Sequence, residues 1–344
     1  MNKLYALQIL RGLAAWLVVF HHYVQLFYDF KSDTWMGYFF HVRGSFGVDI
    51  FFILSGFIMF LITKNNAVTA YSFFMRRVIR VMPAYWLYTS ILIIFSLLFP
   101  VEFSFTDFND SSLFKSYLLI PSENPSGIGV IPFLTVGWTL IYEVVFYTVL
   151  AVSIFMNKKY GVLICFLLIT LIPFIYPEDN VYSYILGEFK IYQFLVGIVI
   201  GMFFKSNYYN KIENNRTASI YFCSMFFLGS LLVLSGIVGY GLFHKTVAAG
   251  FIVLFFILID GKIDYSNRAV MFLVRQGDYS YSIYLSHILV IGVLLYFFGS
   301  EFNLIQELGV VSFLIIFVYL ISTLSYKYIE NGWVTGFLKR ILLK

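Results

Sequence analysis

Long apolar runs recur along the whole sequence, and each is long enough to cross a membrane as a helix. The hydrocarbon core of a bilayer is about 30 Å thick, which an α-helix spans with about 20 residues. A helix also satisfies its own backbone N–H and C=O groups, as that environment requires. The fifth run is the shortest and contains Pro173. The sequence therefore predicts an all-α, polytopic transmembrane helix bundle of about ten spans, at residues 4–26, 44–62, 81–99, 133–155, 162–176, 184–204, 218–237, 242–259, 279–298 and 308–328.

Charged residues are scarce and unevenly distributed between the loops. They make up 12% of the 344 residues, and 60% are hydrophobic, whereas a soluble domain has about 25% charged residues. Lysine and arginine are retained on the cytoplasmic side of membranes. If the N-terminus is cytoplasmic, 18 of the 23 Lys and Arg residues fall on that side, so we expect both termini there. The net charge of +5 then needs no nucleic-acid partner, because inner-face retention and anionic lipid headgroups account for basic loops.

No linker divides the chain into two globular parts, so we expect one membrane domain over residues 1–330 and a short cytoplasmic tail over residues 331–344. The longest loop, from Pro100 to Pro132, is predicted to be external and to be either a functional lid or binding element or else disordered. Cys165 and Cys223 both lie in apolar runs, where small buried residues are common, and no disulfide or metal site is expected. Any chemistry should therefore be carried out by the membrane helices and their loops.

Ionisable side chains inside predicted spans are few, and each is a candidate for function because burying it in lipid is costly. Arg11 and His22 lie in the first run. Eleven residues of helix bring two side chains within about 20° of the same face and separate them by roughly 16 Å. One face thus carries an anion-binding group near the cytoplasm and a proton-transfer group in the outer half. A hydrogen bond that only packs helices together is the alternative for His22.

Two buried carboxylates could serve that histidine. Asp49 lies just inside the outer boundary of the second span, and Glu143 lies near the middle of the fourth. A carboxylate can fix the tautomer and orientation of an imidazole. It can also form a structural ion pair with a buried cation. Both interpretations stay open for both residues.

Three arginines, Arg76, Arg77 and Arg80, lie at the predicted cytoplasmic end of the third span. Arg77 and Arg80 are three residues apart and share a helical face. Retention of positive charge in the cytoplasm explains such a cluster. The guanidinium group is equally suited to binding phosphate.

Polar and aromatic residues form two further candidate groups. Tyr284 and His287 are three residues apart in the ninth span and belong to a polar seam, which could bind substrate or hold helices together. Trp138 and Tyr142 begin the fourth span. Their rings could stack on sugars, although packing within the core or at the membrane interface is the simpler explanation.

Five motifs in order resemble the acyltransferase-3 family of bacterial membrane acyltransferases, in its stand-alone form. The segment "LQILRGLAAWLVVFHHY" is similar to the Arg-x10-His helix of that family, matched by Arg11 and His22. The others are "GSFGVDIFFILSGFIM", "RRVIRVMPAYWL", "WTLIYEVVFY" and "GDYSYSIYLSH". Two departures concern specificity more than membership: Gln8 and Ile9 replace an acidic residue and a glycine, and Thr139 replaces a common serine.

The resemblance implies a bacterial plasma-membrane enzyme that transfers acetyl, sometimes succinyl, from coenzyme A to a lipid-linked or polymeric sugar such as an exopolysaccharide or O-antigen. The arginines would hold the phosphates of acetyl-CoA at the inner mouth. His22 would accept the proton of the sugar hydroxyl, oriented by Asp49 or Glu143. A covalent acyl-enzyme stays possible. A flippase for a lipid-linked sugar is the main alternative, and a scaffold without chemistry is a third.

Overall fold

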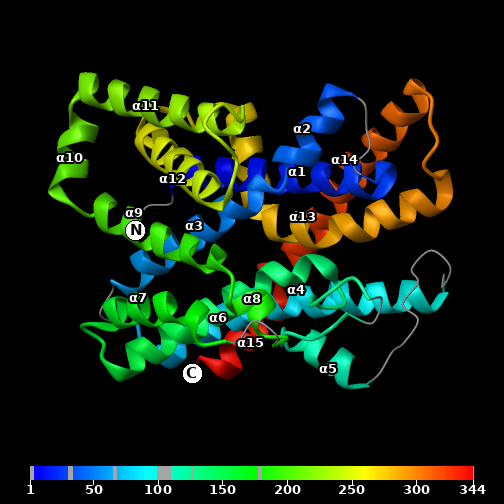
Figure 1. Cartoon of the computed structure of the whole chain (residues 1–344), viewed down its shortest axis with the longest axis horizontal. Helices are drawn as coiled ribbons and strands as arrows, with labels where there is room; N and C mark the ends of the chain where they lie inside the picture. The colour runs from blue at the N-terminus through cyan, green and yellow to red at the C-terminus, as the bar shows by residue number, and fades with distance from the viewer. Residues whose placement is uncertain are drawn as a thin grey trace. The chain divides into compact units, whose positions relative to one another are not determined.

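Helices form all the regular structure in the part of the chain that the computed structural model describes, which is residues 4–29, 34–64, 68–98, 110–124, 127–176 and 180–343 (Figure 1). Within these residues, eight helices are long and apolar enough to cross a membrane. A ninth span results if Phe189–Phe204 and Asn207–Asn214, which meet at 69°, are counted as one broken helix. The predicted helical membrane bundle is therefore confirmed.

The fifth and sixth predicted runs differ from the long, straight spans. The fifth is the short apolar helix Gly161–Phe174, whose last turn is a 3-10 helix containing Pro173. Proline lacks an N–H group and cannot continue the α-helical hydrogen bonds. The sixth run is divided between short turns and α9 (Tyr192–Phe204). All ten apolar runs are thus helical, but these two are too short to pass as single spans by themselves.

The chain folds into two compact units, and α1 (Tyr5–Tyr28), α2 (Trp35–Arg43) and α13 (Arg268–Phe298) each contribute to both. The first unit comprises Met1–His21, Phe39–Ala67 and Lys190–Ser280. Besides parts of α1, α2 and α13, its helices are α3 (Phe46–Thr63), α9, α10 (Asn207–Asn214), α11 (Arg216–Leu234) and α12 (Leu242–Ile259).

Glycines allow the helices of the first unit to pack at short range. α3 packs extensively against α9 and also contacts α12. A Cβ atom on Gly56 of α3 would lie 2.0 Å from the carbonyl oxygen of Phe194, and one on Gly197 of α9 would lie 2.1 Å from that of Ile53. Such small residues let helix backbones approach in a membrane, where apolar side chains gain little from mutual contact.

The second unit comprises His22–Tyr38, Val68–Phe189 and Tyr281–Lys344. Its long helices are α4 (Ala70–Leu98), α6 (Trp138–Met156), the C-terminal part of α13 and α14 (Leu304–Ser325). α6 packs against α4 and against α7 (Gly161–Leu171). The π-helical turn η5 (Tyr326–Glu330) continues α14 and contacts α4.

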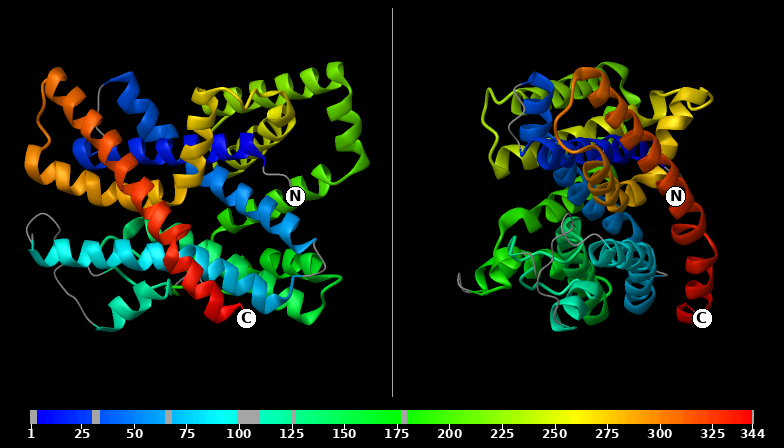
Figure 2. Two further views of the ribbon diagram at one scale, coloured as in Figure 1. Left: turned by 180° about the vertical axis from the view of Figure 1, so that it is seen from behind. Right: turned by 90° about the vertical axis from the view of Figure 1, so that its right-hand side faces the viewer.

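The segment that was expected to be a simple tail is largely a helix, α15 (Trp333–Leu342), which packs along α4 (Figure 2). The predicted external loop also contains a helix. This helix is α5 (Asp110–Tyr117), whose end is held by hydrogen bonds from Tyr85 Oη to the Ser116 carbonyl at 2.8 Å and from Trp86 Nε1 to the Tyr117 carbonyl at 2.9 Å. The orientation in the membrane stays a prediction.

Candidate active site

His22 lies near the end of α1, in the second unit, and its hydrogen bond fixes which ring nitrogen is basic. Its Nδ1 lies 2.7 Å from Oε1 of Gln25, one helical turn further on. An amide oxygen only accepts hydrogen bonds, so Nδ1 carries the hydrogen. In the neutral ring Nε2 then holds the lone pair. Gln25 thus occupies the orienting position at Nδ1 for which Asp49 and Glu143 were candidates.

A second histidine packs against the first. The ring centroids of His22 and His287 lie 5.2 Å apart, with 28° between the ring planes. His287 is completely buried, and its Nδ1 donates to the Ile283 carbonyl at 3.2 Å. The position of His287 on α13 therefore places its ring next to that of the predicted base.

Tyr284 continues this row of rings, because its centroid lies 5.9 Å from that of His287. The Tyr284 hydroxyl donates to the Val136 carbonyl at 2.8 Å and lies 2.8 Å from Oγ1 of Thr139. Both partners lie where the 3-10 turn η1 (Thr135–Gly137) leads into α6. The predicted polar seam of α13 thus holds the start of α6 and places His22, His287 and Tyr284 in one cluster.

Glu143, on α6, belongs to the same unit and lies close to a cation. Its Oε2 accepts a hydrogen bond from the Tyr147 hydroxyl at 2.8 Å. Both Glu143 and Tyr147 interact electrostatically with Arg77 of α4. The Nε atom of Arg77 is buried and has no hydrogen-bond partner among the described residues. A guanidinium donor is therefore left available beside a carboxylate within a span.

The other two arginines of the α4 cluster differ from Arg77. Arg80 forms an ion pair with Glu330 at 2.7 Å, and the Glu330 side chain is completely buried. The Ser282 hydroxyl donates to the same carboxylate. This ion pair ties α4 to the π-helical turn η5. Arg76 is exposed, and its Nε donates to the Ser72 hydroxyl at 3.3 Å.

The aromatic pair at the start of α6 is also in place. The rings of Trp138 and Tyr142 meet edge to face, with centroids 5.9 Å apart. Tyr142 is buried and Trp138 is half-buried. Their proposed contact with sugar stays a prediction.

Asp49 and Arg11 lie in the first unit, where each has a partner of its own. Asp49 is completely buried and accepts a hydrogen bond from Gln193 Nε2 at 2.7 Å. Its Oδ2 has no hydrogen-bond partner within the described part of the chain. Arg11 donates to Oε1 of Gln8 at 3.1 Å. Since α1 is one unbroken helix, Arg11 and His22 keep the helical register that the sequence predicts.

Three partners were not singled out from the sequence: Gln25, Gln193 and Glu330. Gln25 lies three residues from His22, so the spacing of neighbours on a helix could have identified it. Gln193 is contributed by a distant helix, and no local pattern signals its bond with Asp49. Glu330 lies beyond the last predicted span, and the π-helical turn carries it into a buried position.

Comparisons with known proteins agree with the motifs. A family described as "Acyltransferase domain" matches residues 4–327. The chain is 30% identical over 255 residues to the exopolysaccharide production protein ExoZ of Rhizobium meliloti (strain 1021), covering 73% of this chain and 77% of that protein. No solved structure matches the chain. With the family match extending over nearly its whole length, the protein belongs to the acyltransferase-3 family and is a multi-pass membrane acyltransferase.

Proposed function

We propose that the protein transfers an acetyl or succinyl group from cytoplasmic acyl-CoA to a hydroxyl group of a surface or lipid-linked polysaccharide, with His22 as the general base. The observation that carries this proposal is the hydrogen bond from His22 Nδ1 to Gln25. It leaves Nε2 as the proton acceptor of the neutral ring, which is what a general base needs.

The reaction follows from that assignment. His22 Nε2 takes the proton of the sugar hydroxyl as its oxygen attacks the carbonyl carbon of the thioester. The tetrahedral intermediate collapses, the C–S bond breaks, and the proton on the imidazole passes to the departing thiolate. The products are an O-acyl sugar and coenzyme A. A general base of this kind contributes about 10²- to 10⁴-fold to the rate. His287, which packs against His22, would position its ring, and Tyr284 in turn packs against His287.

The arginines support an anionic donor. Acyl-CoA carries phosphates, and the buried Nε of Arg77 is a donor without a partner among the described residues. Arg76 is exposed, so we assign the outer phosphate contacts to it. Arg11 and Arg80 complete the predicted set, although the ion pair with Glu330 commits part of the Arg80 guanidinium to holding helices together. Asp49 and Glu143 are proposed to steer protons or substrate, with Gln25 as the direct partner of the imidazole.

The acceptor is proposed from the comparison and from the aromatic pair. ExoZ is described as an exopolysaccharide production protein, and we extend that role to this chain. Trp138 is half-buried and packs against Tyr142, and aromatic side chains of this kind contact sugars in the proposed role, with Tyr142 adding a hydroxyl group. A bacterial plasma membrane, with donor inside and acceptor outside, is the setting that suits both substrates.

Mass spectrometry of surface polysaccharide tests this proposal. Cells that lack the gene for this protein are complemented with the unchanged protein, with His22→Ala, or with His244→Gln. His244 lies outside the histidine cluster, so its substitution is the control. We expect one additional acyl group per repeat with the unchanged protein and with His244→Gln, and none with His22→Ala at equal membrane abundance. The mass increment distinguishes acetyl from succinyl. Unacylated polysaccharide that is retained inside the cell would instead support a flippase.

A further inference from the structure

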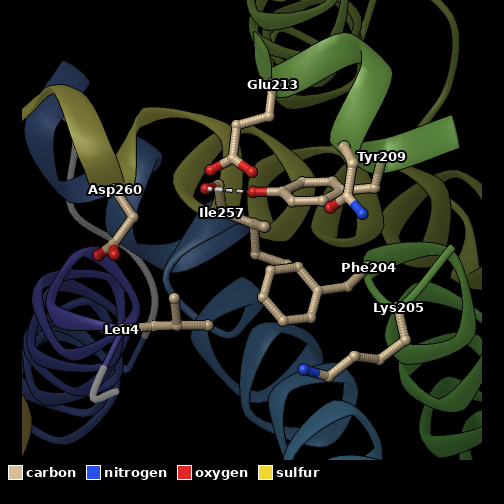
Figure 3. A pocket seen from close by; sticks show the side chains of 8 residues that line it. Leu4, Phe204, Lys205, Tyr209, Glu213, Ile257 and Asp260 are labelled. Atoms are coloured by element: carbon tan, nitrogen blue, oxygen red, sulfur yellow. Dashed lines mark hydrogen bonds between the residues drawn. The ribbon is translucent and has the colours of Figure 1, made fainter. Parts of the chain in front are cut away.

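A cavity of about 270 Å³ lies in the first unit (Figure 3). It is found where several spans end. α9 ends at Phe204, α12 ends at Ile259 and α1 begins at Tyr5. The short helix α10 then leaves α9 at 69°. Because these helix ends meet at the cavity, it lies at a membrane surface, and the positive-inside pattern predicts that this is the cytoplasmic one.

The walls of this cavity carry separated charges over an apolar base. Lys205 lies on the opposite side of the cavity from the carboxylates of Glu213 and Asp260 (Figure 3). The apolar lining consists of Leu4, Phe204 and Ile257. The cavity thus offers a cation at one side, two anions at the other, and hydrocarbon between them.

Neighbouring groups interact with both carboxylates. The Tyr209 hydroxyl, which donates to the Ile257 carbonyl at 3.4 Å, interacts electrostatically with Glu213. Oδ1 of Asp260 accepts from the backbone N–H of Ala6 at 2.7 Å and from the Tyr265 hydroxyl at 2.9 Å. The first of these bonds places Asp260 at the N-terminus of α1, where a negative charge is favourable. Lys205, by contrast, packs its ammonium group over the ring of Phe204 at 5.1 Å.

The ligand that fits such a lining is both zwitterionic and amphiphilic. A phosphate would meet Lys205, and a primary ammonium group would donate to the carboxylates. The cavity has two carboxylates, Glu213 and Asp260, and one ammonium group, Lys205. This excess of negative charge disfavours a purely anionic ligand, such as the nucleotide of coenzyme A or an anionic lipid headgroup. A choline headgroup has no N–H group to donate. We propose that this cavity binds the headgroup of a phospholipid that carries a primary ammonium, as in an ethanolamine lipid.

This proposal is independent of the acyl-transfer reaction, because none of the cavity residues belongs to the histidine cluster or to the arginine group of α4. A bound headgroup would link the start of α1 to α10. The proposal therefore predicts lipid selectivity that persists in a catalytically inactive protein such as His22→Ala.

The test uses the full-length protein purified from vesicles that contain equal amounts of ethanolamine and choline phospholipids with identical acyl chains. Native mass spectrometry counts the retained lipids of each kind. We expect about tenfold enrichment of the ethanolamine lipid, as a charge-assisted hydrogen bond would give. Glu213→Gln should bring the ratio close to one, and Lys205→Met should reduce retention of both lipids.

Asp264→Asn is the matched control. Asp264 is fully exposed and outside the cavity lining, and hydrogen bonds from Ser266 hold the pKa of its carboxyl below its usual range, so this variant also removes one negative charge. It should keep the enrichment. Equal retention of the two lipids by the unchanged protein, or enrichment that survives in a well-folded Glu213→Gln variant, would overturn the proposal. Glutamate-dependent binding of soluble O-phosphoethanolamine by a protein that shows no enrichment of the ethanolamine lipid would overturn the lipid assignment in favour of a free ligand.

Discussion

At the scale of single residues, the proton position on His22 decides what its ring can do. A neutral imidazole is basic at one nitrogen, and the partner at the other nitrogen selects which one. Here that partner is the uncharged amide of Gln25. An amide fixes the tautomer without adding a negative charge. Gln25 is therefore a positioning residue in this account, and His22 is the group that meets the substrate.

We expect Gln25→Leu to lower kcat by about 10- to 100-fold, as loss of a partner that orients a functional histidine does elsewhere. The KM for acyl-CoA should change little, because the proposed role of Gln25 is to orient His22 and not to bind the donor. Gln25→Glu keeps an oxygen acceptor at the same place and should recover part of the rate. Steady-state kinetics on purified protein measure both constants. Equal losses in Leu and Glu variants would argue for a purely structural role.

Arg77 gives a second prediction at this scale. Its buried Nε has no partner among the described residues, so its removal should weaken donor binding. We expect Arg77→Met to raise the KM for acyl-CoA by about tenfold, the effect of losing one charge-assisted hydrogen bond. The KM of Arg77→Lys should fall between that of the unchanged protein and that of Arg77→Met. Lysine keeps the positive charge but lacks the several N–H donors of the guanidinium group. Arg340→Met, an exposed arginine of α15, is the control and should leave the KM unchanged.

At the scale of elements, the helices within each unit are held to one another by close backbone approach in one unit and by a buried polar contact in the other. In the first unit, Gly56 and Gly197 allow α3 and α9 to pack backbone to backbone. In the second, the ion pair between Arg80 and Glu330 joins α4 to η5. The Arg80 side chain is 32% exposed, so solvent weakens the pair, but removing Arg80 alone would leave a buried carboxylate without its cation.

Gly56→Ala should lower the free energy of unfolding by about 1–3 kcal/mol, the usual cost of overpacking. The added Cβ would lie 2.0 Å from a backbone oxygen, which cannot move aside as a flexible side chain would. Gly309→Ala in α14 is the matched control, because nothing lies within 4 Å of its Cβ position. Thermal unfolding in detergent compares the two variants. A similar melting temperature for Gly56→Ala and the unchanged protein would contradict the described packing of α3 and α9.

How far the sequence predicts these elements depends on how local their signals are. Each apolar run lies within a single continuous segment, and the register of Arg11 and His22 depends only on the helix that contains both. These features were predicted correctly. The stacking of His22 on His287 depends on two helices far apart in the sequence, so spacing alone could not predict it. The end of the chain was expected to be a tail because only a short stretch follows the last predicted span, yet α15 packs on α4.

At the scale of the whole molecule, the proposed reaction requires a defined orientation in the membrane. In that proposed reaction the donor is cytoplasmic and the acceptor is outside, so the arginine group of α4 would have to face the cytoplasm. The distribution of Lys and Arg predicts this orientation. The same distribution predicts that the cavity beside α10 lies at the inner surface.

Cysteine labelling checks the orientation. After Cys165 and Cys223 are replaced by alanine, single cysteines are introduced as Glu123→Cys, Lys159→Cys or Lys211→Cys, all at exposed positions. A membrane-impermeant maleimide should label only Glu123→Cys in intact cells and all three after permeabilisation. Labelling of Lys159→Cys or Lys211→Cys in intact cells would reverse the predicted topology and separate the arginines from a cytoplasmic donor.

The most direct measurement is acyl transfer by purified protein in nanodiscs, with radiolabelled acetyl-CoA and isolated polysaccharide, comparing the unchanged chain with His22→Gln. Glutamine keeps a polar side chain but cannot accept the proton. Loss of a general base lowers the rate by about 10²- to 10⁴-fold, so we predict that His22→Gln falls at least about 100-fold while the KM for acetyl-CoA and the melting temperature stay close to those of the unchanged protein. Transfer by well-folded His22→Gln at the unchanged rate would contradict the assignment of His22 as the base.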